Sequence, residues 1–460
     1  MLPSLLRHLP RLALLLSLST VAVAADTWQA GLGRARITPT EPLWMTGYAL
    51  RTKPGSVAAQ DLWVKALAVQ DASGSRGVLV TADLCGVTRQ LTDIVTAELM
   101  RRFSLPRSAI MINASHTHSG PVVDGYLAGL RIISGEDQKR LVAYRAFLEQ
   151  QMIEAASQAL NALAPATLGI GYGEATFGIN RRNNPAGELA KRKAAGTLVG
   201  PTDPRVPILV VKDAKGTLLG ILVSYACHNT TLSGYEFHGD FAGSMQLEIE
   251  RRHPGITALF VTGCAADINP FPRGEVAHAD AHGKALADTT DHVLAGPLSP
   301  IAGKFGSAFD DITLNFSRIP TEEELRTNRE KEQPNKEMYQ AWSQIVSEDL
   351  QHRGSAAVLE HKYPIQAWRI GALSWIALGG EVVVDYGLRL RRELGDSTWV
   401  FGYSNDVMAY IPNERVLKEG RYEGDTSMVP YGKPGKWAPG LEDKIVTRAT
   451  ELVKAAGAGK

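Results

Sequence analysis

Two histidines that are separated by one residue, His116 and His118, are the side chains of this sequence most directly suited to chemistry. They follow an apolar run at residues 109–112 that is typical of a short buried strand, and the Ser, Thr, Gly and Pro around them predict a loop. On extended backbone, side chains two residues apart point the same way, so both rings can face one point. Neutral imidazole is the commonest metal ligand and the usual proton carrier near neutral pH. The pair indicates a metal or proton-transfer site, and the alternative is a pair of solvated loop histidines.

Polar groups suited to the same chemistry follow three further apolar runs, and a tyrosine comes from a fifth stretch. These groups are His228, Asp267 with Asn269, Glu381 and Tyr410. Each has a structural alternative, because a lone histidine is often a core residue, a glutamate is favoured at a helix N-terminus, and an aspartate caps turns. In open α/β sheets, however, ligands bind where the carboxyl ends of strands meet. Two histidines and a carboxylate with one open position form a catalytic zinc site, in which zinc lowers the pKa of bound water to about 7 and polarises a carbonyl.

The elements that must position these groups alternate between strands and helices. We expect strands at residues 31–39, 62–70, 76–81, 109–112, 207–212, 218–225, 258–262, 370–378 and 399–403, with a hairpin between the fifth and the sixth. We expect helices at residues 88–103, 137–163 and 276–294, one that starts near Val382, and a short one at the end of the chain. The sequence contains no repeat period and no linker. It therefore predicts an α/β fold: a single large domain at residues 25–460, with a mixed β-sheet core flanked by helices and an active site at the carboxyl ends of the strands.

Two segments stand apart from this alternation. Residues 320–354 are the most charged part of the chain and predict a helical insertion, broken at Pro334, whose charges form a solvated face. The apolar loop at residues 43–50 is interpreted as a core-packing segment, and the alternative is that it shapes a pocket for an acyl chain.

Composition limits the class of protein. The chain has 460 residues, of which 44% are hydrophobic and 21% charged, as expected for a globular protein with a large core. Residues 1–24 combine two arginines, an apolar run and a small-residue cleavage site, which predicts a secretory signal peptide and export to the periplasm or the extracellular space. Without them the formal net charge changes from +1 to −1, which gives no electrostatic reason to expect a nucleic acid or an anionic membrane as partner. No later apolar run is long enough to predict a transmembrane segment in the mature chain.

The three cysteines, Cys85, Cys227 and Cys264, are too few and too scattered for a disulfide framework or a thiolate zinc site. Each lies at the end of an apolar run, so we interpret them as small buried side chains. A single bridge between Cys227 and Cys264 is the alternative in an oxidising compartment.

Seven short motifs, in order along nearly the whole chain, resemble the catalytic domain of the neutral/alkaline, non-lysosomal ceramidases. The motif Ser-His-Thr-His-Ser-Gly-Pro is fairly specific. Each of the other motifs is weak by itself, but together they occur in the same order as in the family. The motifs lie at residues 45–48, 115–121, 180–181, 227–229, 267–270, 380–381, and 410 with 422–424.

The resemblance implies a zinc hydrolase that cleaves an amide (N-acyl) bond, with ceramide or a ceramide-like lipid as substrate. In the family, zinc is held by the first histidine of the His-Thr-His pair, the histidine after Cys, the glutamate after Gly-Gly and a tyrosine. At the matching positions of this chain the implied ligands are His116, His228, Glu381 and Tyr410. The residues implied to work beside the metal are His118, as a proton shuttle, and Arg181 and Tyr422, which would steady the developing oxyanion.

Two departures from the family pattern bear on the substrate. Asn269 stands where the family has a serine, which excludes a serine nucleophile there but leaves zinc-activated water, because the amide can still hydrogen-bond a carbonyl or a polar head group. Family members usually carry an additional C-terminal β domain, and this chain ends soon after Tyr422. The alternatives are a different N-acyl or ester substrate, or a non-catalytic protein that retains the metal. Dinuclear phosphoesterases also contain His-Thr-His, but the Gly-Asn-His motif that they need is not in the sequence.

Overall fold

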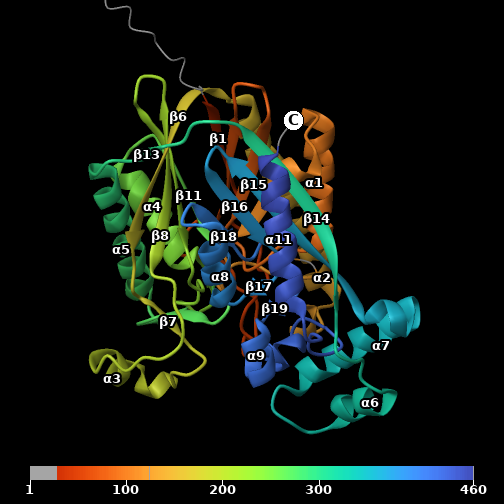
Figure 1. Ribbon diagram of the computed structural model, residues 1–460. Coiled ribbons are helices and arrows are strands. Elements are labelled where there is room, and N and C mark those ends of the chain that lie inside the picture. The colour runs from red at the N-terminus through yellow and green to blue at the C-terminus, as the bar shows by residue number, and fades with distance from the viewer. Residues whose placement is uncertain (1–27, 124, 459–460) are drawn as a thin grey trace, which may run out of the picture.

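The computed structural model describes residues 28–123 and 125–458. They form a large curled β-sheet and a smaller second sheet, which share one hydrophobic core and carry helices on their outer sides (Figure 1). This confirms the predicted mixed α/β architecture flanked by helices. The predicted signal peptide at residues 1–24 lies outside the described residues.

The described strands and helices follow each other along the chain. The strands are β1 (Trp28–Arg36), β2 (Val57–Ala58), β3 (Trp63–Gln70), β4 (Arg76–Ala82), β5 (Ile110–Ala114), β6 (Ala164–Glu174), β7 (Gly178–Asn180), β8 (Arg205–Asp213), β9 (Leu218–Tyr225), β10 (Glu236–Phe237), β11 (Thr257–Thr262), β12 (Ile268–Pro270), β13 (Ser299–Pro300), β14 (Phe305–Asn315), β15 (Glu360–Ile370), β16 (Leu373–Leu378), β17 (Glu381–Val382), β18 (Thr398–Phe401) and β19 (Tyr410–Ile411). The α-helices are α1 (Arg89–Phe103), α2 (Gly135–Asn161), α3 (Leu189–Ala194), α4 (Asp240–Arg252), α5 (Val276–Ala295), α6 (Glu322–Glu330), α7 (Lys336–Val358), α8 (Val384–Leu394), α9 (Glu414–Glu419), α10 (Arg421–Gly424) and α11 (Leu441–Gly457).

The large sheet has nine strands in the order β11-β9-β8-β6-β1-β3-β4-β5, with β13 paired to β6. Its two outermost pairs, β11–β9 and β4–β5, are parallel, and the pairs between them are antiparallel. The two end strands meet, because the Thr262 amide donates to the Asn113 side-chain oxygen at 3.0 Å and the Thr262 hydroxyl donates to the Ala114 carbonyl at 2.9 Å. The carboxyl ends of β5 and β11, which are far apart in the order of strands, therefore lie together in space.

The second sheet has four strands in the order β14-β15-β16-β18. Three of its tryptophans stack, with 5.8 Å between the ring centroids of Trp368 and Trp375 and 5.8 Å between those of Trp375 and Trp399. The buried Gln366 side chain donates to the Ile110 carbonyl at 3.0 Å, and Asn113 donates to the Gly402 carbonyl at 2.8 Å. These buried hydrogen bonds fix the second sheet and the residue after β18 against both ends of β5.

Helices cover the outer sides of both sheets (Figure 1). Helix α2 packs closely on β1 because Gly31 and Gly33 have no side chain there: an added Cβ would lie 2.1 Å from the carbonyl oxygens of Ala159 and Ala155, respectively. Helices α4 and α5 pack together beside β8, β9 and β11, while α8 and α11 lie on the second sheet. Within the described residues, the helices are all too short or too polar to cross a membrane.

Several predicted elements differ from those observed. The first strand begins three residues earlier than expected, at Trp28, and the strands β6, β14 and β15 were not predicted. The segment 370–378 is not one strand, because the chain turns at Gly371 (φ +59°) between β15 and β16, which pair as a hairpin. The last helix, α11, has 17 residues and is not short. The predicted hairpin of β8 and β9 and the helices on either side of Pro334 are confirmed.

Candidate metal centre and active site

Three of the predicted ligands converge on one point at the carboxyl ends of the strands. The Nε2 atoms of His116 and His228 lie 3.1 and 3.0 Å from the same carboxylate oxygen, Oε2 of Glu381. The ligand atoms all lie within 4.8 Å of one another, and all three side chains are buried. His116 follows β5, His228 follows β9, and Glu381 begins β17. We call these three residues the ligand cluster, and their convergence was expected from the sequence.

The two histidines of the ligand cluster are held by backbone carbonyls. The Nδ1 atom of His116 lies 2.5 Å from the Cys85 carbonyl, just beyond β4, and that of His228 lies 2.6 Å from the Ala265 carbonyl, just beyond β11. Each carbonyl fixes the proton on Nδ1 and leaves the lone pair of Nε2 free, which is the form of histidine that binds metals. His116 also has a left-handed backbone (φ +64°), which turns its ring back toward the centre.

Glu381 is placed by the short parallel pair of β17 and β19, in which it lies opposite Tyr410. Its Oε1 accepts a hydrogen bond from the Tyr431 hydroxyl. Its Oε2 is buried, faces both imidazoles and has no hydrogen-bond partner among the described residues. Buried carboxylate oxygens without a partner are rare in proteins. An orphaned carboxylate oxygen between two free imidazole lone pairs fits a bound cation, and two nitrogens with one carboxylate oxygen are ligands that suit zinc.

The electrostatics of the ligand cluster are those of a cation site. Burial alone would raise the pKa of Glu381, but the imidazoles of His116 and His228 outweigh burial and hold it well below its usual range. Burial, together with the charge of His116, lowers the pKa of His228 to about 4. Burial also acts to lower the pKa of His116, but the Cys85 thiol and Glu381 outweigh it and raise that pKa to about 10. The cluster thus stabilises one positive charge, which can be a proton or a metal ion.

His118 lies beside the ligand cluster but outside it. Its Nε2 atom is 3.1 Å from that of His116, and its ring packs edge-on against Tyr48 with 4.9 Å between centroids. Burial, helped by the charges of His116 and His228, lowers the pKa of His118 well below its usual value, so the ring is neutral. A neutral imidazole at the edge of a cation site can accept a proton.

The other predicted site residues gather on one side of the ligand cluster. Arg181 donates from Nη2 to the Tyr410 hydroxyl at 3.1 Å and from Nη1 to the Asn269 side-chain oxygen at 3.3 Å. The Tyr410 hydroxyl lies 3.4 Å from Nε2 of His228. The Tyr422 ring lies against Tyr410, with 5.2 Å between centroids, and against the Arg181 guanidinium. We call Arg181, Asn269, Tyr410 and Tyr422 the arginine cluster.

Glu423 positions the arginine cluster and was missed in the sequence. It accepts a hydrogen bond at 2.7 Å from Nε of Arg181 and also accepts from the buried Arg182, which in turn donates to Glu419 at 2.9 Å. The sequence did contain a signal for these ion pairs. Two adjacent arginines lie in one loop, and two glutamates lie close together in another. Tyr431, the donor to Glu381, was also missed, because it lies in a loop with no periodic pattern.

Asp267 lies at a strand end as expected, but it is outside the ligand cluster. It accepts hydrogen bonds at 2.9 Å from the Asn180 side chain and from the Val384 amide at the start of α8. Burial raises its pKa to about 6. The structural alternative is therefore the right one: Asp267 anchors the turn that carries Arg181, whose own amide donates to the Asp267 carbonyl.

The three cysteines are buried and carry free thiols, so the alternative of a Cys227–Cys264 bridge is wrong. Cys85 lies next to the site, with its sulfur 3.6 Å from Nδ1 of His116. With His116 and His118 it forms a second group of donor atoms that could hold a metal. Because that group shares His116 with the ligand cluster, the two describe one centre.

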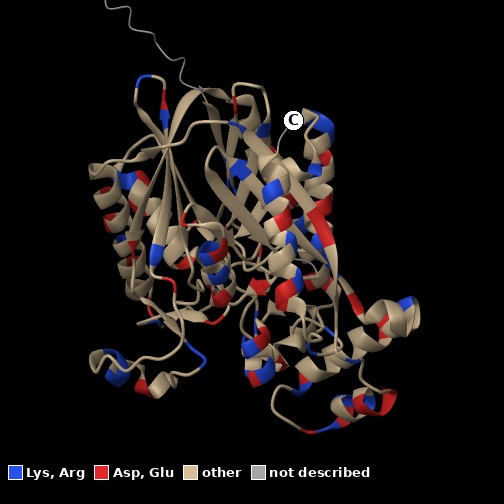
Figure 2. Ribbon diagram, in the orientation of Figure 1, with Lys and Arg blue, Asp and Glu red and all other residues tan. Residues whose placement is uncertain are grey.

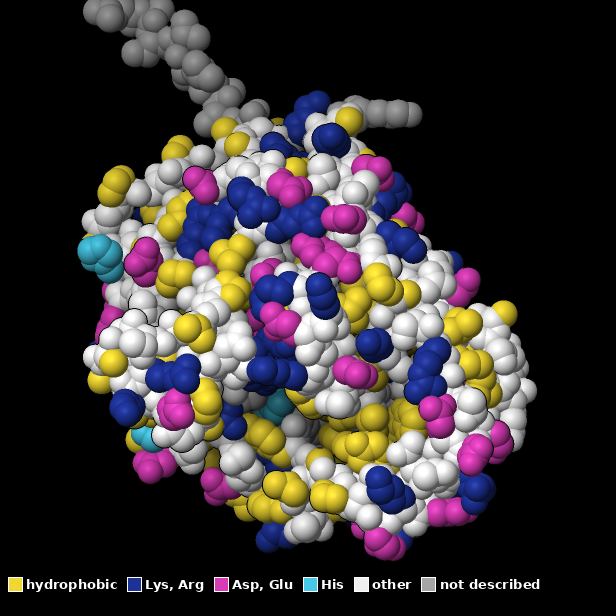
Figure 3. Space-filling model, turned by 60° about the horizontal axis from the view of Figure 1, so that its bottom comes forward, with side chains coloured by type: hydrophobic (Ala, Val, Ile, Leu, Met, Phe, Trp, Pro, Cys, Tyr) yellow, Lys and Arg dark blue, Asp and Glu magenta, His cyan; other side chains and the backbone are white. Residues whose placement is uncertain are grey.

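An open cavity of about 250 Å³ lies beside the site. Its walls come from Met45 and Thr46, from Val122 and residues between 125 and 133, and from α2 and α7. Tyr126 connects the two, because it lines the cavity and its hydroxyl donates to the Cys85 carbonyl at 3.3 Å. Figure 3 shows a hollow on this face, in which a histidine side chain is visible between hydrophobic side chains and a group of Lys and Arg side chains. In the loop at 43–50, Leu43 and Met45 belong to the core, as interpreted from the sequence, and Met45 also lines the cavity.

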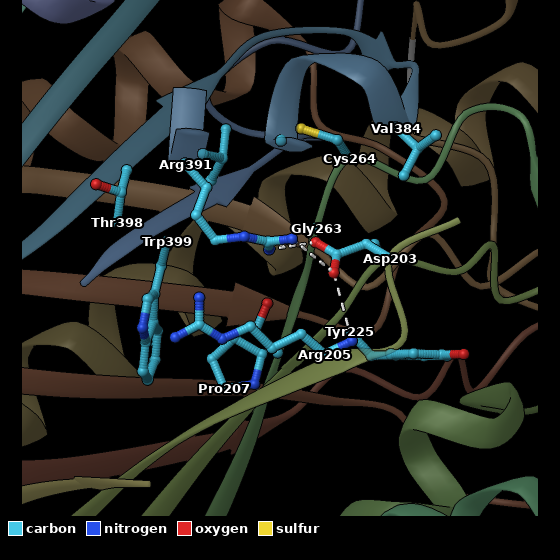
Figure 4. A pocket seen from close by; sticks show the side chains of 14 residues that line it. Asp203, Arg205, Pro207, Tyr225, Gly263, Cys264, Val384, Arg391, Thr398 and Trp399 are labelled. Atoms are coloured by element: carbon cyan, nitrogen blue, oxygen red, sulfur yellow. Dashed lines mark hydrogen bonds and ion pairs between the residues drawn. The ribbon is translucent and has the colours of Figure 1, made fainter. Parts of the chain in front are cut away.

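A second cavity lies between β8, the end of β9, α8 and β18 (Figure 4). It has a volume of about 30 Å³, enough for one or two water molecules. Asp203 and Arg391 meet in it through two hydrogen bonds of 2.6 and 3.1 Å, which fix α8 to the segment before β8. This cavity is a structural contact and is too small for a substrate.

Most of the chain is similar to known ceramidases. The family model described as "Neutral/alkaline non-lysosomal ceramidase, N-terminal" matches residues 28–270. The chain is 23% identical to the neutral ceramidase of Pseudomonas aeruginosa over 489 residues, which cover 91% of this chain and 71% of that protein. It is also 23% identical to the neutral ceramidase of Mycobacterium tuberculosis over 475 residues, covering 85% of this chain and 72% of that one.

Two solved structures share the fold. The crystal structure of neutral ceramidase from Pseudomonas aeruginosa superposes with a TM-score of 0.73 at 20% identity, covering 94% of this chain and 74% of that one. A structure titled "Ceramidase complexed with C2" superposes with a TM-score of 0.70 at 18% identity, covering 94% of this chain and 75% of that one.

Proposed function

The chain belongs to the neutral/alkaline non-lysosomal ceramidase family, and from this premise we propose that it is a zinc-dependent hydrolase of an amide (N-acyl) bond. Ceramide or a ceramide-like lipid is the proposed substrate. The observation that carries the proposal is the orphaned Oε2 of Glu381, which lies between two imidazole nitrogens inside a family that hydrolyses ceramide.

The proposed metal ligands are His116, His228 and Glu381, with Tyr410 as the fourth. The hydroxyl of Tyr410 is 3.4 Å from Nε2 of His228, at the edge of the ligand cluster, which supports that role. When bound there, zinc would supply a water of lowered pKa and a Lewis acid for the acyl carbonyl. The neutral ring of His228 and the ionised carboxylate of Glu381 suit such a site, and the metal would take the place of the proton that His116 holds in its absence.

We propose that His118 moves the proton. Its pKa is lowered by burial, so at neutral pH the ring is a proton acceptor, and its Nε2 faces the ligand cluster. From that position Nε2 would take a proton from the attacking water and return it to the amine that leaves. A positioned general acid/base of this kind contributes about 10²–10⁴-fold to a rate.

We propose that Arg181 and Tyr422 bind the oxygen of the acyl carbonyl as its charge develops. Arg181 is held by Glu423, so its donors are fixed before the substrate arrives, and such preorganised donors are worth about 3–4 kcal/mol of barrier each. The Asn269 side chain shares its oxygen between Arg181 and Thr230, which supports a role in orienting Arg181 or the polar head of the substrate. Asn269 has no nucleophilic oxygen, so the attacking group would be water.

The cavity beside the site supports an acyl chain as part of the substrate. A cavity of about 150 Å³ is enough to hold a six-carbon ring, so 250 Å³ can take a chain of about ten carbons. Other N-acyl compounds and esters would present the same carbonyl and an apolar chain. They are the alternative substrates.

We further propose that residues 1–24 direct export of the protein. N-terminal sequencing of the secreted protein would test this, and we expect Ala25 as its first residue.

The function can be tested with purified protein, a panel of N-acyl lipids that differ in acyl length and head group, and matched esters. We expect release of free fatty acid and amine from at least one N-acyl lipid. A chelator should abolish that release and added zinc should restore it. Activity that survives complete metal removal, or no turnover of any N-acyl compound, would contradict the proposal.

A further inference from the structure

The two most exposed large hydrophobic side chains of the described residues lie on neighbouring loops. Leu50 is 83% exposed and Ile132 is 63% exposed. Nη2 of Arg131 donates to the Ala49 carbonyl at 3.2 Å, and this bond joins the loop of Leu50 to that of Ile132. Single exposed hydrophobic residues are common on protein surfaces, but adjacent ones at a cavity often mark an interaction site.

The loop of Leu50 is anchored, so the exposure of this side chain is fixed by the structure. Arg51 is buried and donates to the Thr46 carbonyl at 2.5 Å and to the Gly234 carbonyl at 3.0 Å. On the other loop, the Arg131 guanidinium lies 4.1 Å from the centroid of Trp44, whose ring nitrogen donates to Asp137 at 2.8 Å. These contacts hold the side chains of Leu50 and Ile132 outward rather than toward the core.

The exposed pair is continuous with the site. Ile132 lines the 250 Å³ cavity together with Thr46, and the next residue, Gly47, packs directly on His118: an added Cβ at Gly47 would lie 2.3 Å from Nδ1 of that ring. An apolar chain that enters between Leu50 and Ile132 would therefore reach the ring of His118 along one wall. Arg131 and the exposed Lys53 flank this entrance with positive charge.

We propose that Leu50 and Ile132, flanked by Arg131 and Lys53, form a surface that inserts into a lipid bilayer and takes the substrate from it into the cavity. We call these four residues the insertion surface. The substrate part of this inference rests on the proposed function, whereas bilayer binding does not. Aliphatic side chains favour the acyl boundary, and lysine and arginine favour anionic head groups. A substrate with a long apolar chain resides in a bilayer, so an enzyme that acts on it gains from this contact.

Bilayer binding can be measured by sedimentation with vesicles of phosphatidylcholine and phosphatidylglycerol that contain no substrate. We expect the wild-type protein to bind, and the double variant Leu50→Ser/Ile132→Ser to bind at least about tenfold more weakly, since two buried aliphatic side chains are lost. The matched control is Ile94→Ser/Leu247→Ser, which removes two exposed hydrophobic residues from α1 and α4 and should bind like the wild type. Equal binding of both double variants, or no binding by the wild type, would overturn the insertion surface.

Activity on two forms of substrate separates this inference from the proposed function. With a short, water-soluble N-acyl substrate, the single variant Leu50→Ser, whose side chain does not line the cavity, should keep its kcat/KM within about twofold, which also shows that it is folded. With substrate embedded in vesicles, it should lose at least about tenfold. If the wild type binds vesicles through these residues but hydrolyses neither substrate, the proposed function fails and the insertion surface stands. If gel filtration shows that the pair instead joins two copies of the chain and vesicles are not bound, the insertion surface is wrong.

Discussion

The ligand cluster and the arginine cluster lie side by side, but they are built differently. His116 and His228 are fixed by backbone carbonyls at the ends of β4 and β11, within a fully buried part of the sheet. Arg181 is instead fixed by a side chain, Glu423, from a distant loop, and its neighbour Tyr422 is 44% exposed. A contact with a backbone carbonyl is not removed by substituting the side chain of the residue that supplies the carbonyl, whereas an ion pair is lost when its carboxylate side chain is replaced. The comparison indicates that the geometry of the ligand cluster is set by the backbone, while that of the arginine cluster depends on a side chain that a substitution can remove.

The largest expected effect is the loss of a residue of the ligand cluster. His228→Ala should lose zinc and all measurable activity, because one of a closed set of buried ligands is removed. Elemental analysis of the purified variant together with an N-acyl hydrolysis assay would check this. Full zinc content in the variant would show that His228 is not a ligand.

Replacing His118 should separate metal binding from catalysis. We expect His118→Ala to keep most of its zinc and to lose at least about 10²-fold in kcat, because a general acid/base is removed and no ligand is. His116→Ala is the matched variant two residues away and should lose zinc and activity together. The reverse pattern, with a metal-free His118→Ala and a zinc-loaded His116→Ala, would exchange the two roles.

Removing Glu423, which positions the arginine cluster, should lower activity less than removing a residue of the ligand cluster. Glu423→Gln should lower kcat/KM by about tenfold, the smaller end of the range for residues that position others. It should also lower the free energy of unfolding by about 3 kcal/mol, because Glu423 is itself buried and its loss leaves both Arg181 and the buried Arg182 without that partner.

Glu419→Gln is the control for Glu423→Gln. Glu419 pairs with Arg182 and Arg415 but makes no hydrogen bond to Arg181, and its side chain is 36% exposed. We expect a loss of less than about 1 kcal/mol in stability and an unchanged kcat/KM. Equal kinetic effects of the two variants would mean that Glu423 does not act through Arg181.

Asn269 should give the smallest effect. Asn269→Ser should remain active, and Asn269→Ala should lose about tenfold or less, the value of one hydrogen bond to Arg181. Steady-state kinetics on both variants would test this. A covalent acyl-enzyme trapped from the wild type would contradict the inference that water is the attacking group.

The sequence predicted the ligand cluster because each of its members follows a strand. His116 and His228 end apolar runs, and Glu381 follows Gly-Gly after another, so strand ends indicated that they would converge. The same argument included Asp267, which lies outside the cluster, and only the resemblance to the ceramidases selected the ligands. Residues such as Glu423 and Tyr431 could not be found in this way, because they come from a loop whose path depends on tertiary contacts. The insertion surface was equally invisible, because exposure of Leu50 depends on the anchoring of its loop by Arg51.

The fold was predicted where hydrophobic runs are uninterrupted and missed elsewhere. Strand β6 contains Pro165 and three glycines, so its pattern does not resemble a strand, although it pairs with β1 and β8 over its length. The strand predicted at residues 370–378 corresponds to β16, which begins only at Leu373 because the chain turns at Gly371, and β15 was missed because its sequence mixes charged and apolar residues and contains Pro364. The meeting of β5 and β11 through Thr262 and Asn113 has no local signal at all.

The most direct test of the central claim is an anomalous diffraction experiment at the zinc absorption edge on crystals of the purified protein. We predict one strong peak about 2.0–2.2 Å from Nε2 of His116, Nε2 of His228 and Oε2 of Glu381, the distances at which zinc binds nitrogen and carboxylate oxygen. A catalytically active crystal with no peak at this point, or with its only peak elsewhere in the chain, would contradict the assignment of these three residues as the metal centre.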